Sequence, residues 1–299
     1  MSEDQPKATH PTIGVFDSGF GGLTILESLL ERLSTYDYTF LADNARAPYG
    51  ARSFDVIHDF TREAVDHLFR LGCPVVILAC NTASARALRT LQRKWLPTAW
   101  PDRRLLGVVR PSAEALAALP PGSIPGATIP SQATGKVAVV ATAGTVASNS
   151  FQIELSKFAP RLELVQQACP MWVPLVENGE LEGPGAEFFV HKYLDPIFQA
   201  ANPPTRLLLG CTHYPLLLPR IREAVPKGTE ILPQGALVAE RLGDWLRRHP
   251  EFEARLTQGG TRTYLTTDDP QWFCAQAKHL VHRVIEAHQV RLSRVENVE

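Results

Sequence analysis

Short apolar segments alternate with longer amphipathic segments along most of the chain. The apolar segments are residues 12–16, 38–41, 74–79, 104–109, 136–141, 162–166 and 206–210. In α/β proteins, buried strands have nearly continuous apolar sequences, and amphipathic helices connect them. The alternation therefore predicts parallel sheets whose strands are joined by crossover helices.

Two amphipathic segments carry clear helix signals. In the first, Ser53 stands at a favourable N-cap position and Gly72 provides the C-terminal stop. In the second, Asp269 and Pro270 begin a helix near the end of the chain. Its expected apolar face comprises Phe273, Ala277, Leu280, Val281, Val284 and Ile285. Such a face must pack on a core, so we expect the C-terminal region to have a structural role as part of the packed fold.

Two pairs of segments indicate an internal symmetry. Residues 75–82 and 206–213 each form an apolar strand that ends in Cys, followed by Asn or Thr and by an expected helix start. Residues 13–19 and 137–145 each combine a strand, a small polar turn and a helix start. We therefore predict two similar α/β halves.

Composition and charge are typical of a globular protein that binds a small molecule. The chain has 299 residues, of which 44% are apolar, and a net charge of -1. Without a basic surface, we expect no binding to nucleic acid or to an anionic membrane. The longest apolar runs are far below the roughly 20 residues of a transmembrane helix. The polar N-terminal segment lacks the features of a secretory signal, which favours a cytoplasmic location.

The cysteine pattern favours free thiols. The chain has five cysteines, namely Cys73, Cys80, Cys169, Cys211 and Cys274. Their odd number and the lack of a CxxC pair argue against a disulfide framework and against a standard zinc site. We therefore expect reduced cysteines and no metal ion.

Cys80 and Cys211 stand at the expected carboxyl ends of two strands. Ligands bind at that edge of open parallel sheets, where helix N-termini present free N–H groups. A helix N-terminus, or a base such as His213 near Cys211, lowers the pKa of a thiol. A single cysteine at either position would more often be a buried core residue. The matched positions in two halves favour a reactive pair.

Two equivalent thiols facing one pocket suit a reaction whose substrate and product are mirror images. One thiolate removes a proton from one face, and the other thiol supplies a proton to the opposite face. The Cα proton of an amino acid is weakly acidic, so donors in a water-poor pocket must stabilise the developing negative charge. The pair thus indicates racemisation.

Other polar positions have competing explanations. Gly19-Phe20-Gly21-Gly22 has the spacing of neither a dinucleotide-binding motif nor a P-loop, which argues against nucleotide binding. Asp43 and Arg46 could form a surface ion pair of little consequence. Glu177 could be a solvated charge on a helix.

Four motifs make the sequence similar to those of the glutamate racemases. They are IGVFDSGFGG at residues 13–22, ADNARAPYG at 42–50, ACNTAS at 79–84 and GCTHYP at 210–215. Weaker similarities are GTVAS at 144–148, PLVENG at 174–179 and LTTDDPQWF at 265–273. The resemblance covers nearly the whole chain in the family's order, and the combination of motifs is highly specific.

The resemblance implies two pseudo-symmetric doubly wound parallel-sheet domains with the active site between them. It places residues 1–107 and 233–299 in the first domain and residues 108–232 in the second. It also implies cofactor-independent racemisation of L-glutamate to D-glutamate, which supplies D-glutamate for bacterial peptidoglycan. The partner is then a small-molecule substrate. The resemblance leaves open whether the protein forms a homodimer.

The same resemblance assigns residue roles. Cys80 and Cys211 are the acid/base residues; Asp17 supports Cys80, and His213 and Glu177 support Cys211. The residues that it places around the substrate are Asp17, Ser18, Pro48, Tyr49, Gly50, Asn81, Thr82, Thr142, Thr145, Thr212 and His213. Many of them offer hydrogen-bond donors, which suits a dicarboxylate.

Some positions depart from the family's pattern. Arg110-Pro111-Ser112 replaces a common Pro-Gly, Phe151 replaces a common Tyr, and Leu232-Pro233-Gln234 replaces an Ile-Asp-Ser type sequence. Segment 120–135 is rich in Pro, Gly, Ser and Thr, and we expect an inserted surface loop there. These changes lie outside the catalytic motifs and bear on regulation, interdomain packing or oligomer geometry.

Three alternative functions stay open. Aspartate or hydantoin racemases could use the same paired thiols, although the PYG and CTHYP motifs favour glutamate. A cysteine hydrolase using Cys211 and His213 would form an acyl enzyme and would not need Cys80. A protein that only binds a metabolite or a partner would not exchange the Cα proton.

Overall fold

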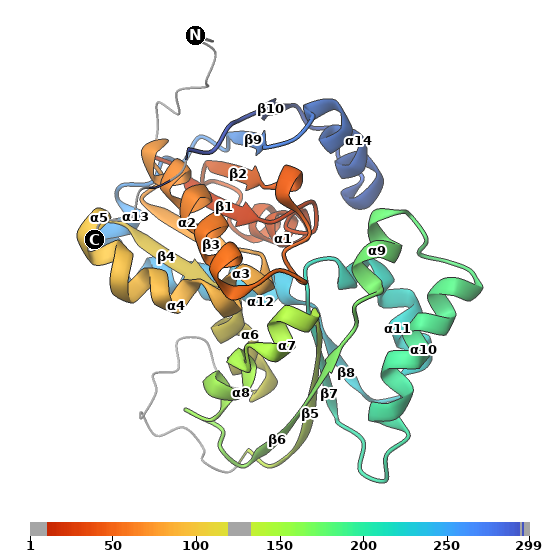
Figure 1. Cartoon of the computed structure of the whole chain (residues 1–299). Helices are drawn as coiled ribbons and strands as arrows, with labels where there is room; N and C mark the ends of the chain where they lie inside the picture. The colour runs from red at the N-terminus through yellow and green to blue at the C-terminus, as the bar shows by residue number, and fades with distance from the viewer. Residues whose placement is uncertain (1–10, 119–132, 294, 296–299) are drawn as a thin grey trace.

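Two parallel sheets form the framework of the molecule (Figure 1). The computed structural model describes residues 11–118, 133–293 and 295. Its strands are β1 (Ile13–Asp17), β2 (Tyr38–Ala42), β3 (Val75–Leu78), β4 (Arg104–Gly107), β5 (Gly135–Ala141), β6 (Leu162–Ala168), β7 (Arg206–Gly210), β8 (Glu230–Leu232), β9 (Arg262–Thr266) and β10 (Ala287–Gln289). One sheet has the strand order β10-β9-β2-β1-β3-β4, and the other has the order β6-β5-β7-β8. Neighbouring strands in both sheets pair in parallel.

The strand orders show the internal symmetry directly. β2-β1-β3-β4 in one sheet corresponds to β6-β5-β7-β8 in the other, so β1 matches β5 and β3 matches β7. The larger sheet is extended beside β2 by β9 and β10, which come from the C-terminal part of the chain. The predicted fold of two similar doubly wound halves is therefore confirmed.

Helices connect and cover the strands of both sheets (Figure 1). The α-helices are α1 (Leu23–Arg32), α2 (Phe54–Arg70), α3 (Asn81–Arg86), α4 (Leu88–Thr90), α5 (Leu96–Ala99), α6 (Val109–Leu116), α7 (Ala143–Ala147), α8 (Ser150–Leu155), α9 (Trp172–Glu177), α10 (Pro184–Phe198), α11 (Leu218–Ala224), α12 (Gln234–Arg248), α13 (Pro250–Glu253) and α14 (Pro270–Val281). The remaining helical segments are the 3-10 turns η1 (Asn44–Arg46) and η3 (Tyr214–Leu217) and the π-helical η2 (Leu91–Trp95).

The apolar pattern located β1 to β7 and missed the later strands. All seven apolar segments named above coincide with β1 to β7 to within a few residues. β8, β9 and β10 were not predicted. β8 and β10 have three residues each, and β9 mixes polar and apolar residues, so none has the continuous apolar sequence of a central strand.

Both predicted helices exist, but the second is shorter than expected. α2 follows Ser53 and ends before Gly72, which has a positive φ of 98°. α14 begins after Asp269, whose side chain accepts from the N–H of Gln271. The predicted extension through Ile285 is wrong, because α14 ends at Val281, His282 takes a left-handed conformation and Val284 is 88% exposed. Most of the loop expected at 120–135 lies outside the described residues.

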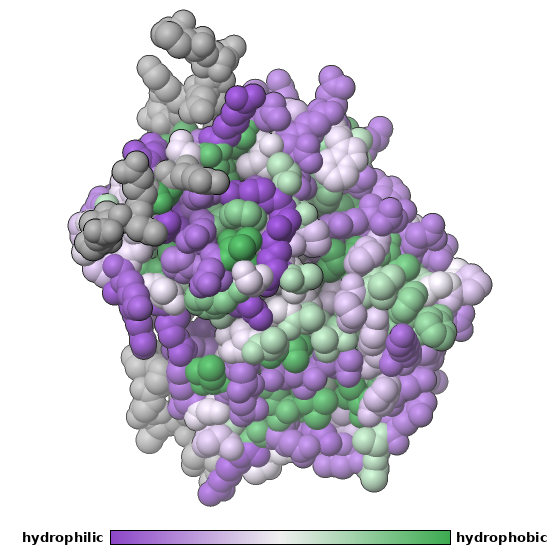
Figure 2. Space-filling view, viewed as in Figure 1, coloured by the Kyte–Doolittle hydropathy of each residue, from purple (hydrophilic) through white to green (hydrophobic). Residues whose placement is uncertain are grey.

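The surface is mixed in character. On the face drawn in Figure 2, polar residues surround separate apolar patches, which do not form a continuous belt. Among the described residues, no helix combines the length and the apolar character needed to cross a membrane.

Candidate active site

The carboxyl ends of the two sheets face each other, and the candidate residues lie where they meet. Asp17 is the last residue of β1, and Thr142 follows β5, the matching strand of the other sheet. The Thr212 hydroxyl donates to Asp17 Oδ2 at 3.4 Å. The hydroxyl oxygens of Thr82 and Thr142 lie 3.0 Å apart. These contacts join residues from the two halves at one site.

Cys80 is buried in the half of the site that β1 and β3 form. It is the N-cap of α3, and its sulfur accepts from the N–H of Ala83 at 3.5 Å and lies 3.3 Å from the Ser18 hydroxyl. Burial raises the pKa of Cys80 to about 12, and the charge of Asp17 adds to this effect. The predicted lowering of this pKa is wrong for Cys80, because lost hydration outweighs the contacts of the sulfur.

Asp17 supplies negative charge close to Cys80. It is fully buried, and its carboxylate accepts from the N–H of Gly19 at 2.9 Å. Burial raises the pKa of Asp17 to about 6, while His213 and hydrogen bonds oppose the increase. The carboxyl group is therefore mostly ionised at neutral pH, where it helps to keep Cys80 in the thiol form.

His213 connects Cys211 to Glu177 in the other half. His213 Nδ1 lies 3.8 Å from the Cys211 sulfur, and His213 Nε2 lies 3.1 Å from Oε1 of Glu177 on α9. Burial disfavours a charged imidazole, but the contacts with Cys211 and Glu177 outweigh burial and raise the pKa of His213 to about 10. The imidazolium thus lies next to the Cys211 sulfur as a positively charged group. Glu177 thus has a buried partner rather than water alone.

The local structure after Cys211 differs from the predicted helix start. The chain enters η3 at Tyr214, and α11 begins only at Leu218. The expectation that both thiols stand at helix N-termini is therefore correct for Cys80 and wrong for Cys211. The two halves share a topology but differ in charge, with a carboxylate beside one thiol and an imidazolium beside the other.

Three threonines and two glycines line the contact between the halves. Thr82 on α3 lies 3.5 Å from Thr145 on α7, and the Thr142 hydroxyl donates to Thr145 at 3.1 Å. The N–H of Gly144 donates to the Gly50 carbonyl at 3.0 Å. These short side chains place several hydrogen-bonding groups together at the junction.

The glycine-rich segment after β1 permits close approach to the CTHYP motif. A Cβ atom on Gly21 would lie 2.3 Å from Thr212 Oγ1 and 2.5 Å from His213 Nδ1. Such distances are far below van der Waals contact, so only glycine fits without displacement of its neighbours. The segment therefore has a steric role in bringing the halves together.

Three predicted site residues have side chains directed elsewhere or exposed. Pro48 is exposed, and the buried Tyr49 donates its hydroxyl to Asp43. Asp43 is fully buried and also pairs with Arg46, so these two residues do not form a surface pair of the kind considered above. The Asn81 side chain contacts Gln234 rather than the sulfur of the preceding residue.

Sequence reasoning missed three polar residues that support the site. Thr24 Oγ1 donates to the Thr212 carbonyl at 2.9 Å. Gln234 contacts Asn81, and Ser112 contacts Gln234. No motif marks Thr24; the segments around Ser112 and Gln234 stood out only as departures from the family's pattern.

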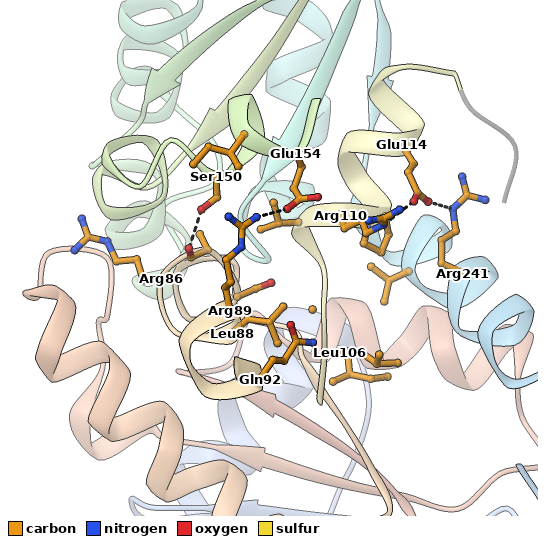
Figure 3. Close-up of a pocket in the computed structure, with 18 of the residues that line it drawn as sticks. Arg86, Leu88, Arg89, Gln92, Leu106, Arg110, Glu114, Ser150, Glu154 and Arg241 are labelled. Atoms are coloured by element: carbon orange, nitrogen blue, oxygen red, sulfur yellow. Dashed lines mark hydrogen bonds and ion pairs between the residues drawn. The ribbon is translucent and has the colours of Figure 1, made fainter. Parts of the chain in front are cut away.

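A large cavity of about 730 Å³ lies away from the cysteines (Figure 3). Figure 3 shows two ion pairs between residues that line it, from Arg89 to Glu154 and from Arg241 to Glu114. Neither Cys80 nor Cys211 lines this cavity, so it is distinct from the candidate active site. Within the described ranges, no group of three or more His, Cys, Asp or Glu residues is arranged to hold a metal ion.

Comparisons with known proteins agree on one family. No protein-family model matches the chain. The glutamate racemase of Roseobacter denitrificans is 39% identical over 277 residues, covering 92% of this chain and 98% of that protein. The solved structure of a glutamate racemase isoform from Bacillus anthracis has a TM-score of 0.81 at 28% identity, covering 95% of this chain and 98% of the other. That of the Francisella tularensis glutamate racemase, in complex with D-glutamate, has a TM-score of 0.80 at 26% identity, with the same coverage. A relative this similar over nearly its full length shows that the chain belongs to the glutamate racemase family.

Proposed function

We propose that the protein interconverts L-glutamate and D-glutamate without a cofactor, with Cys80 and Cys211 as acid and base. The observation that carries this proposal is the pair of buried thiols after matching strands, one near Asp17 and the other beside His213. A two-base racemase needs one protonated and one deprotonated group at the start of each turnover. The negative charge of Asp17 near Cys80 and the positive charge of His213 beside Cys211 favour one protonated and one deprotonated thiol.

The proposed reaction moves one proton at each face of the substrate. For the enantiomer whose Cα–H faces Cys211, the Cys211 thiolate accepts the proton, and the Cα–H electron pair stays on the substrate as a carbanion. The Cys80 thiol then donates its proton to the opposite face, which leaves Cys211 as a thiol and Cys80 as a thiolate. The other enantiomer follows the same steps in reverse. The equilibrium constant is unity because the substrate and the product are mirror images and have the same free energy.

The surrounding residues would bind the substrate and orient the thiols. We assign Asp17 to the support of Cys80, and His213 with Glu177 to the support of Cys211. The proposed substrate-binding set is Asp17, Ser18, Pro48, Tyr49, Gly50, Asn81, Thr82, Thr142, Thr145, Thr212 and His213. Short hydroxyl side chains and backbone N–H groups in this set offer donors to carboxylates and to the developing negative charge.

The same proposal covers the domain division and the cellular role. We assign residues 1–107 and 233–299 to one domain and residues 108–232 to the other, which follows the membership of the two sheets. D-Glutamate made in the cytoplasm would serve peptidoglycan synthesis. A homodimer is compatible with this scheme.

Exchange of the Cα proton in D2O tests the function. We expect the reduced, cofactor-free protein to replace the Cα proton of L-glutamate with deuterium, by NMR, and to form D-glutamate, by chiral chromatography. Turnover of aspartate in place of glutamate would refute the substrate assignment. Binding of glutamate with no Cα exchange would refute the racemase assignment.

A Cys80→Ala variant separates racemisation from hydrolysis. Two-base racemisation requires Cys80, so we expect D-glutamate formation to be lost. A cysteine hydrolase based on Cys211 and His213 would keep its activity in this variant and would accumulate an acyl enzyme.

A further inference from the structure

Gln234 lies at the centre of a buried polar network. Its Oε1 accepts from Asn81 Nδ2 at 2.6 Å, and its Nε2 donates to Asn81 Oδ1 at 3.0 Å and to Ser112 Oγ at 2.6 Å. The Ser112 hydroxyl in turn donates to the carbonyl of Val108 at 2.7 Å. Gln234, Asn81 and Ser112 are 1%, 2% and 0% exposed, so water cannot readily replace any of these contacts.

The network connects three places that matter for the site. Asn81 is the first residue of α3 and directly follows Cys80. Ser112 is on α6, which follows β4 as the chain leaves the six-stranded sheet. Gln234 begins α12, which follows β8 as the chain leaves the four-stranded sheet. One glutamine therefore joins both connections between the sheets to the residue beside a candidate catalytic thiol.

The first turn of α3 sets the position of the Cys80 sulfur. The sulfur accepts from the N–H of Ala83, so a shift of this turn also shifts the sulfur. The reciprocal amide contacts of Gln234 hold Asn81 from the side of α6 and α12. A displacement of about 1 Å in a reacting group can reduce a rate about 100-fold.

We propose that Gln234 is a positioning residue, which holds Asn81 and thereby orients Cys80 relative to the substrate. The inference rests on the proposed racemase function. Gln234 does not itself touch the reacting atoms; it transmits the arrangement of the two interdomain connections to one of the two thiols. Loss of this contact should impair the proton transfer of Cys80 and spare that of Cys211.

Isotope effects with Cα-deuterated L- and D-glutamate distinguish this role from a general loss of stability. Gln234→Met keeps the length of the side chain and removes its hydrogen bonds. We expect kcat to fall about tenfold. If the Cys80 step becomes slower, the deuterium effect on kcat/KM should rise for the enantiomer that gives its proton to Cys80 and fall for the other. A smaller fraction of folded protein would leave both isotope effects unchanged.

Thr39→Val is a matched control. Thr39 is fully buried on β2 and contacts the Thr12 hydroxyl at the end of the sheet opposite the site. This variant loses a buried hydrogen bond, as Gln234→Met does, but we expect wild-type kcat per folded protein and wild-type isotope effects.

Ser112→Ala tests the same network if Gln234→Met does not fold. This variant keeps the contacts between Asn81 and Gln234 but removes the hydrogen bond from Gln234 to Ser112. We therefore expect smaller changes of the isotope effects in the same directions. In the double variant, kcat should fall no further than in Gln234→Met alone, because both changes break one chain of contacts. Wild-type isotope effects in both single variants would overturn the positioning role while leaving the racemase function intact. A wild-type protein that exchanges no Cα proton would overturn both proposals.

Discussion

At the scale of single residues, the two candidate bases have opposite electrostatic surroundings. Cys80 is near the buried carboxylate of Asp17, and Cys211 is beside the imidazolium of His213. The carboxylate disfavours a Cys80 thiolate, which keeps Cys80 ready to donate and makes its thiolate a stronger base once formed. The imidazolium places a positive charge close to the sulfur of Cys211. The two thiols therefore have neighbouring charges of opposite sign.

The ionisation of Asp17 should appear in the pH dependence of the reaction. Because burial raises the pKa of Asp17 to about 6, its charge is lost below that pH and present above it. We expect kcat/KM for glutamate to rise as the pH increases through about 6. Asp17→Asn should lower kcat/KM about 100-fold and remove this rise. Glutamate itself has no group that titrates near pH 6, so persistence of the rise in Asp17→Asn would assign it to another residue.

At the scale of secondary structure elements, the segment between β1 and α1 must pass very close to the CTHYP motif. Gly21 is the position where this approach leaves no space for a Cβ atom. The contact links the end of one sheet to the candidate base of the other. The positions of His213 and Thr212 therefore depend on a glycine far away in the sequence.

Gly21→Ala tests this dependence. The added methyl group should displace Thr212 and His213, so we expect kcat to fall at least about tenfold and stability to fall by about 1–3 kcal/mol. The control is Gly185→Ala on α10, where a Cβ atom would meet nothing within 4 Å. It should retain wild-type kcat and thermal stability. Equal kcat values for both variants would show that the close approach has no functional role.

The sequence predicted the elements that carry the site better than the contacts within it. Continuous apolar strands such as β3 and β7 can be recognised because burial on both faces requires them. The short strand β8 carries no such signal. The bridge between Asn81 and Gln234 was not predictable, because it joins residues that only the tertiary structure brings together. The prediction of a lowered pKa for Cys80 was also wrong, because the burial that raises this pKa depends on the packing of both halves.

At the scale of the whole molecule, buried and exposed ion pairs connect the segments that we assign to different domains. Arg241 on α12 pairs with Glu114 on α6 at 2.9 Å, and their side chains are 13% and 6% exposed. Arg89 and Glu154 pair at 2.7 Å, but the Arg89 side chain is 48% exposed. All four residues line the cavity shown in Figure 3. Their different burial predicts different contributions to stability.

Removal of each arginine tests that difference. Arg241→Met leaves the buried carboxylate of Glu114 with the ion pair to Arg110 at 3.0 Å but without that to Arg241, so we expect the free energy of unfolding to fall by about 2 kcal/mol. Arg89→Met should cost less than about 1 kcal/mol, because water and salt screen an exposed pair. Urea unfolding at low and high salt measures both values. Similar losses in the two variants would contradict a dominant role for burial.

The order of the strands also affects how the protein is made. The residues of β2 are synthesised early, but those of its outer neighbour β9 belong to the last part of the chain. The residues of the four-stranded sheet, by contrast, form one continuous stretch that leaves the ribosome earlier. The backbone N–H and C=O groups along the outer edge of β2 therefore lack their strand partner until β9 is synthesised, whereas all four strands of the other sheet are available earlier. An unpaired, apolar strand edge readily pairs with other chains, so the nascent protein is most exposed to aggregation before Arg262–Thr266 is added.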